Sequence, residues 1–442
     1  MSNAIDRDFT FASLLRFAFP SIVMMVFLSL YTIVDGFFIS RFVGSNALSA
    51  TNIIFPVINV ELAVGIMLAT GGSAVVARRM GMGEEEHARQ DFTLIVLAGL
   101  AASAVFLLLG LFAVEPISLA LGASEALLPY CVDYLRILML FAPAYFLQNL
   151  FQSFFVAAGR PGLGLGLTLA AGVANMVLDY VFIVPLDMGI SGAAWATVIG
   201  YCIPAVVGTA FFALRRHGLR FARPHWAPRM LLHCCGNGSS EMVTNLANAV
   251  VTFLFNYFML RFLGEDGVAA ITIVLYAQFL LTALYMGFSM GVAPVISFSY
   301  GAENLPRLRR VFRSCAGFIV LSSVAIFGLA LAFAPHIVSL FSPAGTPVYT
   351  LAEAGFRLFS PAFLFAGVNI FSSALFTALS DGKTSALISF LRTFGFLLLG
   401  LLLLPLSLEA DGVWMAVPFA EVLSCAVSLV CLFRGRRRYH YA

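Results

Sequence analysis

Several oxygen-bearing side chains stand inside apolar stretches of this chain, where polar groups are costly. The stretch 173–183 holds Asn175 and Asp179, which are four residues apart and share one face of a helix. Thr197 adds a hydroxyl in the next apolar stretch, and Asp35 is the one acid of the first. Carboxylate, amide and hydroxyl oxygens suit a small hard cation or a shared proton, and not a soft transition metal. These four residues, here called the oxygen set, therefore predict a cation or proton site.

A structural reading of the same residues is open as well. Asn175, Asp179 and Thr197 could form a polar knot that ties helices together, with about 0.6 kcal/mol per hydrogen bond in membrane proteins. The presence of two acids favours the ion site, because a knot does not require two ionisable groups. Asp35 could also be a helix-end acid that reaches water. Arg41 argues against this helix-end reading, because it lies beyond Asp35 and already marks the polar end of the segment.

Two further acids lie in apolar surroundings, Glu61 in the second apolar stretch and Glu241 in the seventh. Either could line a substrate cavity and attract a cationic compound. Each could equally be a structural hydrogen-bond acceptor or a residue at a helix end. The sequence therefore offers them as candidates for the cavity and leaves both roles open.

The elements that must position these residues are transmembrane helices. The chain has 442 residues, of which 61% are hydrophobic and 11% charged, and its mean hydropathy is +0.97. Soluble domains carry about 25% charged residues, so the composition indicates a polytopic membrane protein. Twelve stretches are long enough to cross a bilayer as helices. They run over residues 14–40, 47–77, 91–115, 131–158, 162–185, 189–214, 236–262, 268–298, 311–336, 350–379, 383–406 and 411–433.

The two halves of the chain repeat. Moving the first half forward by 220 positions places glycines and prolines on one another at equivalent helix ends. The coinciding pairs include Gly44 and Gly264, Gly71 and Gly291, Gly81 and Gly301, and Pro185 and Pro405. We therefore expect an all-α integral membrane protein with twelve transmembrane helices in two pseudo-symmetric lobes of six. The lobes are expected over 1–214 and 236–442, with a linker over 215–235 and a basic tail at the end of the second lobe.

The repeat also predicts an asymmetry, because the oxygen set is not duplicated. The positions equivalent to Asp35, Asn175 and Asp179 are Phe255, Gly395 and Leu399. An even number of spans per half makes the repeats parallel, which is the layout of a transporter with its site between two lobes. Ionisable chemistry is therefore expected in the N-terminal lobe.

Basic residues predict the orientation in the membrane. The formal net charge is +3, but the arginines cluster in short loops at alternate ends of the spans, above all in 215–229 and 434–438. This pattern reflects topology and does not indicate a nucleic-acid partner. The opposite loops hold little more than Arg41 and Arg261. The positive-inside rule then places both termini and the linker in the cytoplasm, with the chain in the cell (inner) membrane.

The sequence resembles a known family in four stretches and in its duplicated plan of twelve spans. The stretches read YTIVDGFFISRFVGSNALSATNIIFPV, GGSAVVARRMG, NMVLDYVFI and GISGAAWATVIGY. They resemble the multidrug and toxic compound extrusion (MATE) family, close to its MepA-like branch, over essentially the whole chain. The resemblance implies a cation-driven antiporter that exports amphiphilic, often cationic small molecules by alternating access. It implies a monomer in the lipid bilayer, with no enzymatic activity and no cofactor besides the coupling ion.

By the same resemblance, the oxygen set corresponds to the family's N-terminal Na⁺ or H⁺ site, with Na⁺ as the metal that it could hold. The NorM type of the family also uses acids in the C-terminal lobe. The acids of the C-terminal spans in this chain, Glu241, Glu353 and Glu421, do not match that pattern. We therefore do not expect a sodium site in the C-terminal lobe.

The alternative function is a flippase for lipid-linked precursors with the same architecture. Such a protein would carry basic residues in its cavity for pyrophosphate. Within the spans, only Arg136, Arg357 and Arg392 lie away from the ends, and Asp133 and Glu353 are spaced to neutralise the first two. Arg392 keeps this alternative open. An enzyme or a channel is not indicated, since the sequence contains no catalytic triad, HExxH motif, P-loop or filter motif.

Overall fold

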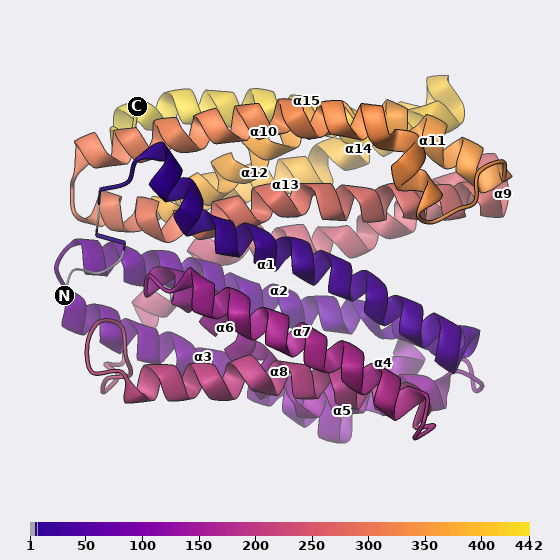
Figure 1. Cartoon of the computed structure of the whole chain (residues 1–442), viewed down its shortest axis with the longest axis horizontal. Coiled ribbons are helices and arrows are strands. Elements are labelled where there is room, and N and C mark those ends of the chain that lie inside the picture. The colour runs from indigo at the N-terminus through magenta and orange to yellow at the C-terminus, as the bar shows by residue number, and fades with distance from the viewer. Residues whose placement is uncertain (1–4, 7) are drawn as a thin grey trace.

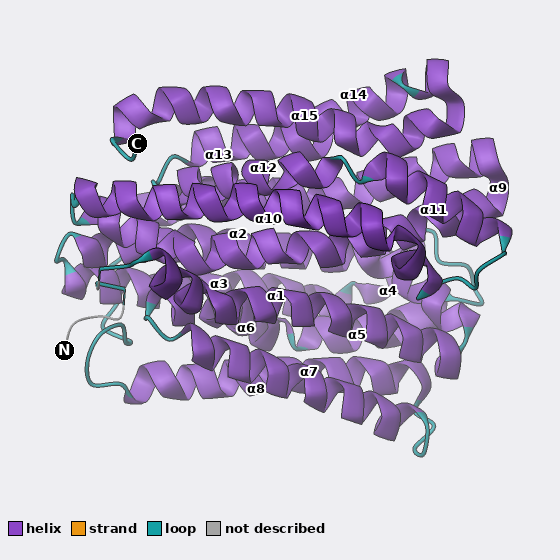
Figure 2. Cartoon of the chain, turned by 45° about the horizontal axis from the view of Figure 1, so that its top comes forward, coloured by secondary structure: helices purple, strands orange, loops and turns teal. Residues whose placement is uncertain are grey.

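The computed structural model describes residues 5, 6 and 8–442, without the side chains of residues 33, 35–37, 39, 40, 45, 48 and 249. Helices run side by side along the long axis of the molecule, and the described part contains no strand (Figures 1 and 2). Both ends of the chain lie at the same end of this bundle, here called the terminal end (Figure 1). The all-α prediction is confirmed.

The N-terminal half contains eight α-helices and one π-helical turn. These are α1 (Phe11–Phe38), η1 (Ile39–Val43), α2 (Ser45–Gly81), α3 (Glu85–Phe112), α4 (Val114–Ala120), α5 (Leu128–Leu140), α6 (Ala142–Ala157), α7 (Pro161–Ile183) and α8 (Gly189–Leu214). The C-terminal half follows a matching order. Its elements are α9 (Pro228–Gly301), α10 (Leu305–Ser339), α11 (Pro347–Phe359), α12 (Ala362–Ala378), α13 (Gly382–Phe390), η2 (Leu391–Gly395), α14 (Phe396–Leu403) and α15 (Pro405–Tyr439).

The number of spans in the described chain agrees with the predicted twelve. Nine helical stretches are long and apolar enough to cross a membrane. The bent pairs α5–α6 and α11–α12 each add one span. The ninth helix adds the last, because its backbone turns at Gly264, with φ 69° and ψ −156°, and so joins two spans. The left-handed φ explains the glycine at this position.

Proline bends one span in each half. The helices α5 and α6 meet at 56°, with Pro143 in the first turn of α6. Their counterparts α11 and α12 also meet at 56°, next to Pro361. Proline removes a backbone donor and clashes with the preceding turn, so the helix restarts in a new direction. Pro56 and Pro20, by contrast, lie inside continuous helices.

The two lobes meet along α1, α2 and α9, and they are tightly joined at the terminal end (Figures 1 and 2). A methyl group on Gly81 would collide with the carbonyl oxygen of Phe298, and one on Gly301 with that of Arg78. Because these two contacts are related by the 220-residue repeat, they are pseudo-symmetric. Only glycine allows backbones to approach so closely, which makes this end a closed joint between the lobes.

Candidate functional site

Three members of the oxygen set lie together inside the N-terminal lobe. The side chains of Asn175 and Asp179 on α7 are 2% and 0% exposed, and that of Thr197 on α8 is 5% exposed. The amide Nδ2 of Asn175 donates to Oγ1 of Thr197 at 3.4 Å. The Thr197 hydroxyl in turn donates to the carbonyl of Ala193 at 3.0 Å, which leaves its lone pairs facing Asn175. The i, i+4 spacing thus places two polar groups of α7 on the buried face against α8.

Small residues make this close packing feasible. Gly200 of α8 lies against the backbone of Ala171, where a methyl group would come within 3.3 Å of the carbonyl oxygen. Gly172 of α7 lies against the ring of Phe27 on α1, close enough that a methyl group would collide with it. From this contact, both helices run two turns further to positions 35 and 179. The backbone of position 35 therefore stands at the level of Asp179, while the side chain of Asp35 lies outside the described residues.

A small pocket with several polar side chains in its lining, here called the enclosed polar pocket, lies beside Asn175 and Thr197. Its volume is about 20 Å³, enough for one water molecule. Its polar lining comes from α1, α6, α7 and α8 and consists of Tyr31, Gln148, Gln152, Thr168, Asn175, Thr197 and Tyr201. The Gln152 amide donates to Thr168 at 3.2 Å. Gln148 Oε1 and Asn175 Oδ1 are buried and accept no hydrogen bond from any described group.

The donors gathered here suit a hard cation or a proton. A carboxylate, an amide oxygen and a hydroxyl are the ligands that Na⁺ takes, and the unsatisfied Oδ1 of Asn175 is a buried acceptor that a bound ion or water would satisfy. The described part of the chain contains no cluster of three metal-binding His, Cys, Asp or Glu side chains. The geometry thus suits a light ion better than a transition metal.

Glu61 and Glu241 occupy two different places. Glu61 lies on α2 inside the N-terminal lobe, where its side chain is only 4% exposed. Glu241 is half-buried on α9 in the C-terminal lobe, within electrostatic reach of Arg392. Neither residue lines the enclosed polar pocket or the groove described below.

The C-terminal lobe contains a buried charged network that sequence reasoning missed. Arg392 Nε donates to Glu421 Oε1 at 2.8 Å, and the side chains of both residues are largely buried. Asn369 Nδ2 donates to the other oxygen of Glu421 at 2.6 Å, and Ser428 donates to Asn369 Oδ1 at 2.9 Å. Arg392 stands in the π-helical turn η2, which is a local departure from α-helix geometry. No spacing rule links residues 29 positions apart, so only the fold could identify this pair.

The two expected pairs of charges on single helices have different outcomes. Arg357 Nη2 lies 2.8 Å from Glu353 Oε1, so this neutral pair is confirmed. The expected pairing of Asp133 with Arg136 is wrong, because both residues are exposed and form no salt bridge in the described structure. At i, i+3 the short aspartate gains little in water from such a contact.

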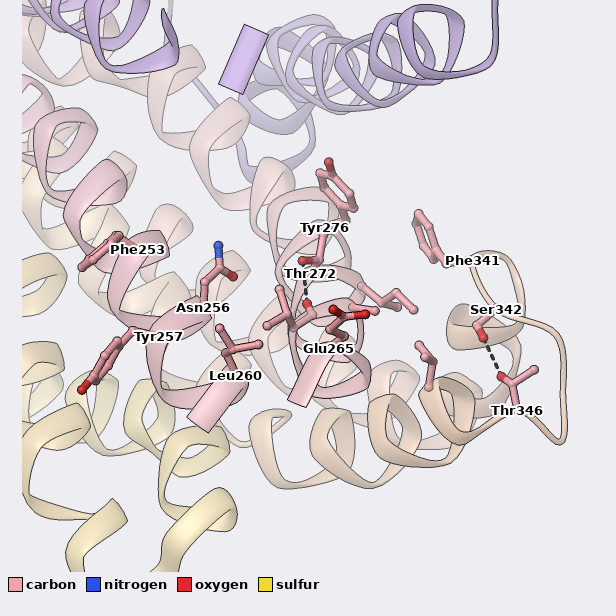
Figure 3. A pocket seen from close by; sticks show the side chains of 14 residues that line it. Phe253, Asn256, Tyr257, Leu260, Glu265, Thr272, Tyr276, Phe341, Ser342 and Thr346 are labelled. Atoms are coloured by element: carbon pink, nitrogen blue, oxygen red, sulfur yellow. Dashed lines mark hydrogen bonds between the residues drawn. The ribbon is translucent and has the colours of Figure 1, made fainter. Parts of the chain in front are cut away.

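A large groove opens in the C-terminal lobe around the turn of α9 (Figure 3), at the end of the bundle opposite the termini (Figure 1). Its volume is about 920 Å³. It lies between the two arms of α9 and the loop that follows α10, and its walls carry Phe253, Tyr257, Tyr276 and Phe341. The rings of Tyr276 and Phe341 stack with their centroids 6.2 Å apart. Glu265 is the one charged residue in this lining.

Comparison with known proteins finds one family model on both halves of the chain. The MatE model matches residues 20–181 and again residues 242–403. A curated relative, the multidrug export protein MepA of Staphylococcus saprophyticus, is 20% identical over 448 residues, which covers 98% of this chain and 96% of the relative. The MepA protein of Staphylococcus aureus is 21% identical, with the same coverage.

Solved structures have the same fold. A structure described as MATE in complex with MaL6 superposes with a TM-score of 0.91 at 21% identity, covering 99% of this chain and 98% of that one. At this level of identity the likeness establishes the fold alone. The expected MATE architecture is thereby confirmed.

Proposed function

The chain belongs to the MatE family of multi-pass membrane transporters, which are not enzymes, and from this premise we propose that it is a secondary antiporter. It exports amphiphilic, cationic small molecules across the cell membrane in exchange for Na⁺ or H⁺, by alternating access. The observation that carries this proposal is the buried group of oxygen-bearing side chains, Asn175, Asp179 and Thr197. Ionisable groups at this depth are expensive and mark ion pathways in transporters.

We assign the coupling ion to the oxygen set in the N-terminal lobe. Asp35 joins Asn175, Asp179 and Thr197 in this proposal because its backbone position is level with Asp179 on the adjoining helix. Na⁺ or H⁺ would neutralise the acids and allow α1 and α7 to pack closely. Without the ion, the charged acids favour a hydrated arrangement, so ion binding biases the equilibrium between two conformations.

The substrate class follows from the groove and from the relatives. The curated relatives are named multidrug export proteins. Tyr257, Tyr276 and Phe341 offer ring faces to a flat cation, and Glu265 offers a compensating charge (Figure 3). In this conformation the lobes are joined at the terminal end. If that end is cytoplasmic, as the basic loops predict, the groove faces the outside and releases substrate there.

The alternative, a flippase for lipid-linked pyrophosphates, is disfavoured by the charge of the C-terminal lobe. Arg392 was the basic residue that kept this alternative open, and its guanidinium is bound to Glu421 at 2.8 Å. Glu241 also lies within its electrostatic reach. One cation shared by two carboxylates offers no net positive charge to an anionic headgroup.

The test is transport by the monomeric protein in proteoliposomes. A fluorescent lipophilic cation should be driven across the membrane by an imposed Na⁺ gradient or by a pH gradient, whichever ion couples. An anionic lipid-linked substrate should not be moved. If neither gradient drives the cation, the antiport proposal is wrong.

A further inference from the structure

Glu61 is a buried acid with no counter-charge among the described residues. It lies near the middle of α2 (Ser45–Gly81), its side chain is 4% exposed, and its Oε1 accepts no hydrogen bond from the described residues. No described arginine, lysine or histidine forms a salt bridge with it. An isolated carboxylate at membrane depth is strongly disfavoured, and such groups are held neutral unless a cation binds them.

The packing of α2 against α6 sets the surroundings of Glu61. Gly65 faces Asn149, since a methyl group on Gly65 would lie 3.7 Å from Nδ2 of Asn149. One turn earlier on each helix stand Glu61 and Tyr145, and both helices run toward the terminal end (Figure 1). The register therefore brings the carboxyl group to the level of Tyr145, and the two groups interact electrostatically.

Phenols are the titratable groups that face this acid. Tyr145 of α6 and Tyr201 of α8 both interact electrostatically with Glu61. Their rings lie 4.9 Å apart between centroids. Tyr31 of α1 interacts electrostatically with both of them, and Tyr134 of α5 with Tyr201. None of these groups is cationic, so the ligand that neutralises Glu61 must come from solvent.

The available space selects a proton as this ligand. The rings of Tyr145 and Tyr201 are tilted against each other, and the enclosed pocket that Tyr201 lines holds about 20 Å³. An organic ammonium group does not fit there. A proton needs no space, and the pocket has room for a water that could carry it to Asn175 and Thr197, which also line the pocket.

We propose that Glu61 is a proton-binding site of the N-terminal lobe, connected through the Tyr201 hydroxyl to the enclosed polar pocket. In the conformation described here the carboxyl group holds the proton as a neutral acid. On release, it donates this proton to the Tyr201 oxygen while that phenol passes its own proton to water in the pocket, which leaves a carboxylate. The site is additional to the oxygen set, and it does not depend on whether that set takes Na⁺ or H⁺.

The test compares infrared spectra of the full-length wild type and of its variants in nanodiscs, without substrate or gradient. The wild type at neutral pH should show the C=O stretch of a protonated carboxylic acid, and Glu61→Gln should remove the part of this band that belongs to Glu61. The matched control Glu353→Gln should keep the band at full intensity, because Glu353 forms a salt bridge with Arg357. An unchanged band intensity in Glu61→Gln overturns the proposal, as does the absence of the band from the wild type.

Two further measurements keep the test decisive. Labelling the glutamate side-chain carboxyl groups with ¹³C in the wild type should shift the band, and an unshifted band would assign it to an aspartate and overturn the proposal. Tyr201→Phe should keep the band and slow its hydrogen–deuterium exchange, whereas unchanged exchange contradicts the role of the phenol. Since no gradient is used, failure of ion-driven efflux would refute the coupling proposal without affecting this result.

Discussion

Single residues of the oxygen set differ in what they contribute. Thr197 both donates to Ala193 and accepts from Asn175, so its hydroxyl orients the amide. Asn175 then presents an unsatisfied Oδ1. An ion site depends on such preset oxygens, whereas a purely structural knot depends only on the hydrogen bonds.

We expect Thr197→Val to weaken ion-driven efflux, because valine keeps the shape and removes the acceptor for Asn175. Thr197→Ser restores the hydroxyl and should recover transport. The measurement is the dependence of efflux rate on Na⁺ and H⁺ concentration in proteoliposomes. Equal activity of the valine and serine variants would indicate that the hydroxyl has no part in coupling.

Asp179→Ala should abolish ion-coupled efflux, whereas Leu399→Ala, at the repeat-equivalent position, should leave most of it. Leu399 is 41% exposed on α14, so its truncation removes no buried polar group. Efflux rates are compared at equal protein levels in the membrane. Similar losses in both variants would point to general packing damage and not to an ion site.

Asp35→Asn tests the remaining member of the set. The amide mimics the neutral, ion-bound carboxyl group, so folding and substrate binding should persist while gradient-driven transport is lost. Substrate binding to the purified variant and efflux in vesicles separate these effects. Normal gradient-driven efflux would return Asp35 to a structural role.

At the scale of elements, the lobes hold their polar groups in different ways. The N-terminal lobe packs α7 against α8 and α1 around uncharged amides, hydroxyls and an acid. In the C-terminal lobe, hydrogen bonds of the charged pair Arg392 and Glu421 and of the Asn369 amide join α12, η2 and α15. The second lobe thus supplies its own cation, which agrees with the expectation that no sodium site lies there.

Arg392→Met should destabilise the C-terminal lobe by about 3–5 kcal/mol, since it leaves Glu421 buried without its partner. The double variant Arg392→Met/Glu421→Gln should recover much of this loss, because no unpaired charge remains. Thermal unfolding in detergent measures both. A double variant as unstable as the sum of the single ones would show that the two residues are not coupled.

At the scale of the molecule, alternating access requires a joint that can open. Gly81 and Gly301 allow a close approach between the lobes at the terminal end, next to Phe298 and Arg78. The N-terminal segment adds a second contact across the lobes. Arg307 of α10 binds the carbonyl of Ile5 and lies 3.5 Å from Asp6.

Gly301→Leu should force the terminal end apart, because its side chain would enter the backbone of α2. Gly317→Leu is the matched control, since a side chain there meets nothing within 4 Å. Distances between spin labels on the two lobes should lengthen in the first variant only. An unchanged distance would mean that this joint does not hold the lobes closed.

The orientation prediction is tested by reporters after Ala442 and in the expected linker 215–235, at residues 215–227, which precede α9. This linker is fixed to α3, where Arg89 donates to the carbonyl of Gly218 and Ala222 donates to Thr93, both at 3.0 Å. Both reporters should be cytoplasmic, because the flanking loops are basic. A periplasmic signal from either reporter would overturn the orientation.

The sequence by itself determined the class, the twelve spans and their duplication. Membrane helices are read reliably because bilayer thickness fixes their length and apolar character. It also identified Asn175 and Asp179 as partners on one face, since i, i+4 spacing is a local property of the helix. The bend beside Pro143 follows from a similarly local rule, since a proline interrupts its own helix.

Only the tertiary structure decided which side chains from distant helices meet. Arg392 and Glu421, or Glu61 and the phenols of Tyr145 and Tyr201, are brought together by lobe packing that leaves no periodic trace in the chain. Asp133 and Arg136 had suitable spacing, yet both are exposed and no salt bridge forms. Local spacing fixes which face a residue occupies, whereas burial and partners depend on the neighbouring helices.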